Sequence, residues 1–251
     1  MSGGRAYIGT SGWNYRHWRG RFYPPGLRQA DWLDYFVHRF RSVEVNNAFY
    51  RVPAPDHVRQ WARRAPSRFR FAVKMWRGVT HFKKMKDCRE HLRKFFEPVK
   101  ELPGSQRGPV LVQLPSNQGK DLDKLDTFLA DVKEMTRPTR WKIAVEFRRR
   151  DWLGIETYDL LDRHRAAICL HDMPPADVIS TNGARFVYLR RHGPAGDYRG
   201  SYSSRAIAED AARVRGWLSE GRMVFVYYNN DAEACAIHDA QRLEEAIAEL
   251  G

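Results

Sequence analysis

The chain has 251 residues and three scattered cysteines, Cys88, Cys169 and Cys235, with no Cys-x-x-Cys pair. This spacing excludes a disulfide framework and is typical of a protein from a reducing cytoplasm. The sequence shows no signal-peptide pattern at its start and no apolar stretch long enough to span a membrane. We therefore expect a cytoplasmic protein without a membrane partner. The net charge of +13 favours an anionic partner.

Eight short apolar runs alternate with helical patterns along the whole chain. The runs are short and most are rich in β-branched or aromatic residues, as in strands that are buried on both faces. A length of 251 residues also suits the roughly 250 residues of an eightfold barrel. We predict an α/β fold, a single-domain (β/α)8 TIM barrel over residues 1–251 with eight parallel strands and outer helices. The apolar runs are 7–9, 43–45, 71–73, 110–112, 143–145, 167–170, 186–189 and 224–228.

Helical spacing of apolar residues fills the gaps between these runs. Pro55-Asp56 suits the first turn of a helix, and Ser203-Ser204 is a capping sequence for a helix that stops at Gly221. The other helices are expected over 31–40, 87–102, 121–135, 155–164 and 232–250. Strand and helix thus alternate to the end of the chain.

Two further segments suggest a binding surface. The segment from Arg63 to Lys94 contains twelve lysines and arginines but only two acidic residues, Asp87 and Glu90. A segment this basic predicts attraction to a polyanion such as nucleic acid, although a solvated basic face has the same pattern. The loop from Ser11 to about Gln29 contains five aromatic residues, including Trp13 and Tyr15, which either stack on a base or sugar or cover the barrel.

Polar side chains follow most of the predicted strands, where a TIM barrel carries its active site. Because side chains alternate across a strand, parity indicates which of them point inward. At the sixth strand His171 and Asp172 are adjacent, and we predict that Asp172 is the inward residue. The inward set is Glu44, Asn46, Lys74, Gln113, Glu146, Arg148, Asp172, Arg190 and His192, and Asn229 follows the last strand.

These residue types suggest roles in a site that binds a charged ligand. Glu146 suits a general acid or base, His192 suits a proton shuttle, and Arg190 suits a clamp on phosphate or carboxylate. Converging carboxylates would also hold a divalent cation such as magnesium or manganese. The alternative is a lattice of ion pairs that only fills the barrel mouth. We predict catalytic roles for Glu146, Asp172, Glu44 and His192, and substrate binding by Asn46, Lys74, Gln113, Arg148, Arg190, Trp13, Tyr15 and Asn229.

Many motifs, taken in order, resemble the YecE-like family, also called the domain-of-unknown-function 72 family. They include Ile8-Gly9-Thr10-Ser11-Gly12-Trp13, Val43-Glu44-Val45-Asn46-Asn47, Leu111-Val112-Gln113-Leu114-Pro115 and Tyr228-Asn229-Asn230-Asp231. The resemblance spans nearly the whole chain and implies a barrel similar to the endonuclease IV-like and xylose isomerase-like groups. It adds Tyr198 to the predicted substrate-binding residues. Arg149 departs from the family pattern, which has histidine after Glu-Phe-Arg.

Three functions fit these patterns. The first is a nucleic-acid-binding barrel that acts as a metal-assisted phosphodiester hydrolase, with Glu146, Asp172 and Glu44 holding a metal or moving protons. The second is an isomerase or hydrolase of a sugar or sugar phosphate, in which Lys74, Arg148 and Arg190 bind the anionic group and Glu146 abstracts or donates the proton. The third is a non-catalytic module that binds nucleic acid or a protein. The oligomeric state is not predicted.

Overall fold

Eight parallel strands alternate with helices in the computed structural model, which describes residues 4–139 and 141–250. The strand order is β1-β8-β7-β6-β5-β4-β3-β2. A parallel bridge between Ser11 and Glu44 joins the end of β1 to β2. This is the topology of the TIM barrel, and the predicted fold is confirmed. The strands are β1 (Arg5–Thr10), β2 (Ser42–Val45), β3 (Arg70–Lys74), β4 (Arg107–Gln113), β5 (Ile143–Glu146), β6 (Ala167–His171), β7 (Phe186–Arg191) and β8 (Met223–Tyr228).

The helices agree closely with the periodicity of the sequence. Asp121 caps α4 by accepting a hydrogen bond from the Lys124 amide, and Ser203 caps α6 by accepting one from the Ala206 amide. The last helix begins later than expected, because Glu233 and Ala234 have positive φ angles and separate a short turn from α7. The helices are α1 (Trp32–Val37), α2 (Pro55–Arg64), α3 (Arg89–Val99), α4 (Leu122–Thr136), α5 (Ile155–His164), α6 (Ser204–Ser219) and α7 (Cys235–Glu249).

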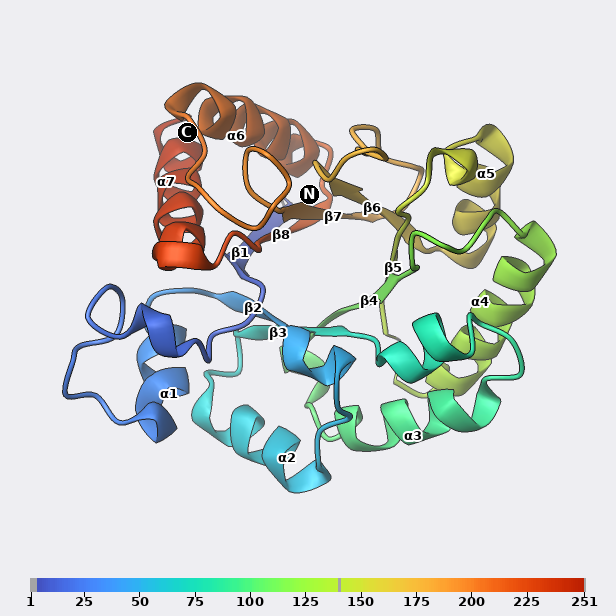
Figure 1. Cartoon of the computed structure of the whole chain (residues 1–251), viewed down its shortest axis with the longest axis horizontal. Coiled ribbons are helices and arrows are strands. Elements are labelled where there is room, and N and C mark those ends of the chain that lie inside the picture. The colour runs from blue at the N-terminus through green and yellow to red at the C-terminus, as the bar shows by residue number, and fades with distance from the viewer. Residues whose placement is uncertain (1–3, 140, 251) are drawn as a thin grey trace. The chain divides into compact units, whose positions relative to one another are not determined.

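The chain divides into two compact units. The first unit comprises the described residues of Met1–Glu44, Leu170–Ile179 and Arg185–Gly251. In this unit β7 and β8 pair in register from Phe186 and Met223 onward, and β8 pairs in turn with β1. Helices α6 and α7 lie side by side next to these strands (Figure 1). Both helices have buried apolar side chains, among them Ile207, Ala211 and Leu243.

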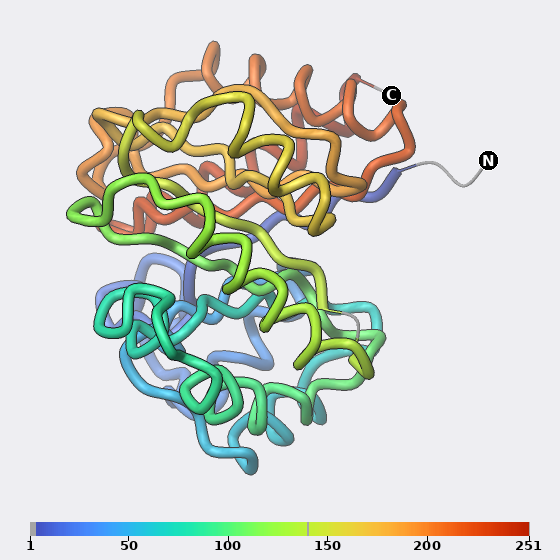
Figure 2. The backbone as a smooth tube through the Cα atoms, turned by 90° about the vertical axis from the view of Figure 1, so that its right-hand side faces the viewer, coloured from blue at the N-terminus to red at the C-terminus, as the bar shows by residue number. Residues whose placement is uncertain are grey.

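The second unit comprises Val45–Cys169 and Ser180–Ala184. Strands β3, β4 and β5 pair in parallel, and helices α2 to α5 follow one another beside them (Figures 1 and 2). Residues of β4 such as Val110, Leu111 and Val112 are fully buried, as expected for a strand covered on both faces. The division into two units leaves the single-domain organisation over 1–251 a prediction.

Two features limit what strand parity predicts about the polar residues. Strand β2 ends at Val45, so Asn46 begins a short 3-10 turn, Asn46–Phe49. Strand β6 ends at His171, so Asp172 lies beyond the regular strand, where alternation no longer decides direction. No helix in the described part of the chain is long and apolar enough to cross a membrane.

Candidate functional site

The carboxylate of Glu44 is the centre of a buried polar network in the first unit. Arg190 grips it in a fork, with Nε 3.1 Å from Oε2 and Nη2 2.9 Å from Oε1. Ser11 and Tyr188 each donate a hydroxyl hydrogen bond of 2.6 Å to the same carboxylate. Both Glu44 and Arg190 are inaccessible to solvent. The four donors occupy the acceptor positions of Glu44 and pair its charge with that of Arg190, and the catalytic role of Glu44 stays a prediction.

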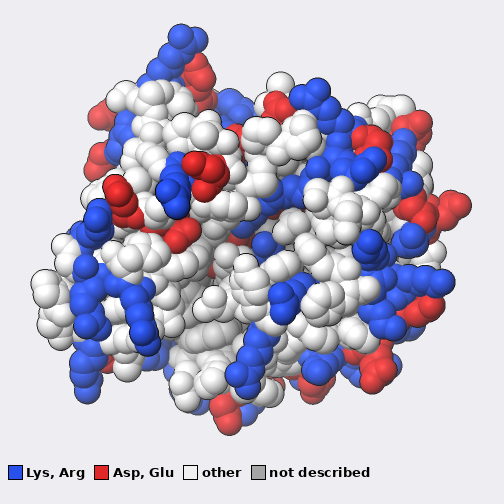
Figure 3. All heavy atoms as spheres, viewed as in Figure 1, with Lys and Arg blue, Asp and Glu red and all other residues white. Residues whose placement is uncertain are grey.

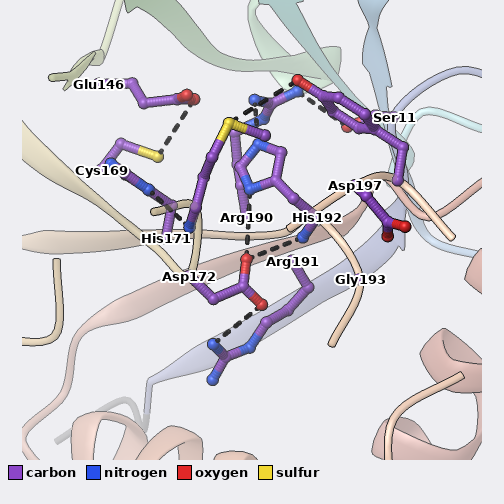
Figure 4. Close-up of polar contacts among 12 residues, drawn as sticks. Ser11, Glu146, Cys169, His171, Asp172, Arg190, Arg191, His192, Gly193 and Asp197 are labelled. Atoms are coloured by element: carbon purple, nitrogen blue, oxygen red, sulfur yellow. Dashed lines mark hydrogen bonds and ion pairs between the residues drawn. The ribbon is translucent and has the colours of Figure 1, made fainter. Parts of the chain in front are cut away.

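His192 and Asp172 extend this network beyond Arg190, and Figure 4 shows these three side chains. The third guanidinium nitrogen of Arg190, Nη1, lies 2.9 Å from Nε2 of the buried His192. On the other side of the ring, Nδ1 lies 3.3 Å from Oδ1 of Asp172, which also accepts the His192 amide at 2.9 Å. The structure thus brings together the predicted site residues Glu44, Asp172, Arg190 and His192 in one chain of hydrogen bonds.

Asp172 is an ionised acceptor with several donors. Its Oδ2 accepts a short hydrogen bond from the Tyr202 hydroxyl and lies 3.5 Å from Nη1 of Arg191. Burial raises the pKa of Asp172, but the hydrogen bonds from His192 and Tyr202 and the charge of Arg191 outweigh burial and lower the pKa to about 2. Arg191 also forms a fork with the buried Asp210. Tyr202, Arg191 and Asp210 were not predicted from the sequence. Arg191 has the outward parity on β7, and Tyr202 and Asp210 do not lie in a strand.

Three other predicted residues of the first unit have different surroundings. Tyr198 is 42% exposed, and its ring centroid lies 5.7 Å from that of His192. Asn229 is buried, and its backbone N–H donates to the Arg191 backbone carbonyl at 2.7 Å. Tyr15 is half-buried, packs on Trp18 at 4.8 Å and donates its hydroxyl to the Ser11 carbonyl.

Trp13 is half-buried, and its carbonyl accepts from the hydroxyl of the buried Tyr23. Tyr15, Trp18, Tyr23 and Trp32 form a cluster of contacting rings. Base stacking by Trp13 and Tyr15 stays a prediction, and their observed contacts are those of packing residues.

Glu146 and Arg148 form an ion pair in the second unit. Glu146 is fully buried at the end of β5, and one of its oxygens is in close contact with Nη2 of Arg148. The other oxygen lies 3.9 Å from the thiol of Cys169, a weak contact that Figure 4 also draws. Gln113 is the register partner of Glu146 across the sheet, and its side-chain amide donates to the Leu114 carbonyl. The catalytic role of Glu146 stays a prediction.

Three cations surround His81 in the second unit. His81 lies in a π-helical turn, Gly78–Phe82, that follows β3. Burial lowers its pKa, and the positive charges of Lys74, Arg77 and Arg148 lower it further, to about 4. The ammonium of Lys74 lies 4.2 Å from the ring centroid of Phe49, a cation–π contact. The predicted cations Lys74 and Arg148 therefore share one electropositive region with Arg77.

Asn46 lies in the turn that contacts β3, next to this region. Its side-chain oxygen is buried and has no hydrogen-bond partner among the described residues. A buried acceptor without a partner is unfavourable, so a donor group from a ligand would stabilise it.

Two exposed aromatic rings flank Arg77. Tyr50 is 59% exposed and Phe82 is 68% exposed, and both rank among the most exposed large apolar side chains that the structure describes. The Arg77 guanidinium carbon lies 5.6 Å from the Tyr50 ring centroid and 5.2 Å from that of Phe82. We name Tyr50, Lys74, Arg77, His81, Phe82 and Arg148 the Arg77 surface. Lys74 and Arg148 were predicted as site residues from the sequence. The aromatic residues of this surface, Tyr50 and Phe82, were not predicted, although Phe82 lies close to Lys74 and Arg77 in the sequence.

The basic segment between Arg63 and Lys94 is only partly balanced by acids. Arg89 pairs with Asp131 and Glu134 of α4. For Lys83, Lys86 and Arg93, which are exposed, the described residues include no ion-pair partner. On the face drawn in Figure 3, lysine and arginine are widely spread with acids among them. Binding of a polyanion by this segment stays a prediction.

The described residues contain no group of three or more histidine, cysteine, aspartate or glutamate side chains placed to hold a metal ion. Glu44, Glu146 and Asp172, which the sequence offered as ligands, instead accept from arginine, tyrosine, serine, cysteine and histidine. The involvement of a divalent metal stays a prediction.

Comparison with known proteins gives the same family from sequence and from structure. The profile of the family described as "Protein of unknown function DUF72" matches residues 7–250. The UPF0759 protein YunF of Bacillus subtilis (strain 168) is 24% identical over 166 residues, 61% of this chain and 54% of the relative. The UPF0759 protein YecE of Escherichia coli (strain K12) is 26% identical over 143 residues, 57% of this chain and 48% of the relative. These matches span about half the length of the curated relatives.

A crystal structure of a DUF72 family protein from Thermotoga maritima MSB8 has a TM-score of 0.84 and 25% sequence identity to this chain. The superposition covers 97% of this chain and 99% of that one. The fold is therefore shared over nearly the whole length.

Proposed function

The chain belongs to the DUF72 family, and on that premise we propose that it binds nucleic acid through the Arg77 surface of its second unit. The observation that carries this proposal is the position of Arg77 between the exposed rings of Tyr50 and Phe82, beside the three-cation environment of His81. Nucleic acids present phosphates and flat bases together, and this surface offers cations and exposed rings together.

The three cations Lys74, Arg77 and Arg148 would contribute an affinity for nucleic acid that does not depend on the nucleotide sequence. Burial is the largest cause of the low pKa of His81, and a phosphate near Lys74, Arg77 and Arg148 would offset the positive charges that lower this pKa further. Each lysine or arginine that neutralises a phosphate releases counterions, so binding weakens as salt rises.

The exposed rings favour nucleic acid over a small sugar phosphate. A small phosphate needs cations and hydrogen-bond donors, whereas two exposed aromatic side chains around an arginine suit unpaired bases. The Arg190 guanidinium, which the sugar-phosphate hypothesis used as a clamp, has two of its nitrogens engaged by Glu44. Phosphodiester hydrolysis stays a prediction from the sequence.

The test is an affinity series for single-stranded and duplex oligonucleotides at rising salt. We compare the natural protein with Arg77→Gln and with Arg59→Gln, which removes the same charge from α2, where Arg59 already pairs with Asp56 and Glu101. Arg77→Gln should weaken binding and reduce the salt slope by about one. Arg59→Gln should leave both unchanged. Equal effects of the two variants, or no binding at low salt, would overturn the proposal.

A further inference from the structure

His192 in the first unit is held as a neutral imidazole of one tautomer. Arginine has donors only, so the 2.9 Å contact between Arg190 Nη1 and His192 Nε2 requires Nε2 to be an acceptor. The single ring proton of the neutral imidazole then lies on Nδ1, which faces Oδ1 of Asp172 at 3.3 Å. An ionised carboxylate on Nδ1 and a lone pair on Nε2 are the arrangement that a histidine general base requires.

The lone pair of Nε2 is covered by a donor that can find a better acceptor. Glu44 holds Arg190 through Nε and Nη2, so the contact of Nη1 with His192 lies outside this fork. An anionic oxygen accepts a hydrogen bond from a guanidinium more strongly than a neutral imidazole does. A phosphate oxygen next to Nη1 would therefore draw the donor away from Nε2 and leave that lone pair available.

The partly exposed ring of Tyr198 lies edge-on to the His192 ring, with the two centroids 5.7 Å apart. Its hydroxyl makes a 3.9 Å contact with the Met173 sulfur, which is a weak hydrogen bond. Its backbone has φ of +68°, in a loop where Gly193, Gly196 and Gly200 also have positive φ. A bulky residue in this region is strained, and such strain concentrates at functional sites. The Tyr198 side chain is thus a weakly held neighbour of the histidine ring.

From these contacts we propose that His192 is a general base for a phosphate-bearing ligand, and that the ligand's phosphate uncovers it by engaging Nη1 of Arg190. In the step, a water O–H bond breaks and the proton goes to Nε2, while the electron pair stays on the oxygen as hydroxide. The imidazolium so formed is stabilised by Asp172. The charged and titratable groups around the ring are Asp172, Arg190, Arg191, His171, Tyr198 and Tyr202. This inference does not depend on the Arg77 surface.

The experiment is nitrogen NMR of the His192 ring with inorganic phosphate as the probe. Without phosphate at neutral pH, Nδ1 should be protonated and Nε2 should not. Added phosphate should shift the ring toward the imidazolium form. The shift should need several-fold less phosphate in Tyr198→Ala, and it should be much smaller in Asp172→Asn, which keeps the shape but removes the charge.

Tyr50→Ala is the matched control, because it removes another exposed tyrosine and should leave the His192 response unchanged. Two results would overturn the proposal: a proton on Nε2 in the absence of phosphate, or no response to phosphate in either the natural protein or Tyr198→Ala. Loss of oligonucleotide binding in Arg77→Gln with an intact His192 response would leave this inference standing.

Discussion

The two units balance their buried charge in opposite ways. In the first unit, Glu44 faces Arg190 in a fork, and Asp172 faces Arg191, His192 and Tyr202. In the second unit, one acid, Glu146, contacts Arg148, while His81 experiences the charges of Lys74, Arg77 and Arg148 together. The named ions of the first unit are paired with opposite charges, whereas three positive charges act together on one histidine in the second unit, where an anionic ligand would offset them. The predictions below test this difference, beginning with the largest expected effect.

The largest effect is expected from Glu44→Gln. The change keeps the shape of the side chain but leaves the buried Arg190 charge without its carboxylate. Breaking a buried pair in this way should lower the free energy of unfolding by about 3–5 kcal/mol. Denaturant unfolding measures this change, with Glu209→Gln as the control, because Glu209 forms an exposed pair with Arg205 and should have almost no effect. A similar stability for both variants would show that the Glu44 network is not what distinguishes the first unit.

An intermediate effect is expected from the double variant Tyr50→Ala and Phe82→Ala. Removing both rings should weaken binding of a single-stranded oligonucleotide by about 1–3 kcal/mol for each base that stacks, and duplex binding much less. Ile155→Ala, which removes another exposed apolar side chain of the second unit, is the control and should change neither. Equal losses for single strand and duplex would mean that the rings do not contact bases.

The smallest effect is expected in the pH dependence of stability. The folded pKa of His81 is about 4, below its ordinary value of 6.5. The unfolded chain therefore binds a proton first as the pH falls, and the stability decreases between about pH 6.5 and 4. Above this window His81 is neutral in both states and contributes nothing. His81→Gln should flatten the curve in this window in denaturant unfolding, and an unchanged curve would contradict the three-cation environment.

The sequence predicts the scaffold better than the sites because burial imposes a period on strands and helices. The runs at 143–145 and 167–170 lie within β5 and β6, and the helix over 155–164 is found at those bounds. Parity also predicted that Glu44 and Arg190 both point inward, and the rule applies to them because both lie inside regular strands. It had no basis for Asn46 or Asp172, which lie beyond the strand ends.

The Arg77 surface was only half predicted, for a related physical reason. Arg77, His81 and Phe82 lie in or beside a π-helical turn, whose period differs from that of a helix or a strand. Tyr50 comes from a separate turn, so the sequence does not show that it contacts Arg77. For the aromatic loop, the structure places the Tyr15 ring against Trp18 and the Trp13 carbonyl against the Tyr23 hydroxyl, and base stacking by Trp13 and Tyr15 stays a prediction.

The most direct test of the central claim is the pKa of His81, measured by NMR with and without a saturating single-stranded oligonucleotide. If phosphates bind among Lys74, Arg77 and Arg148, they offset the charges that depress this pKa, and it should rise from about 4 toward its ordinary value of 6.5. A pKa that stays near 4 while the oligonucleotide is fully bound would show that binding occurs elsewhere and would contradict the account.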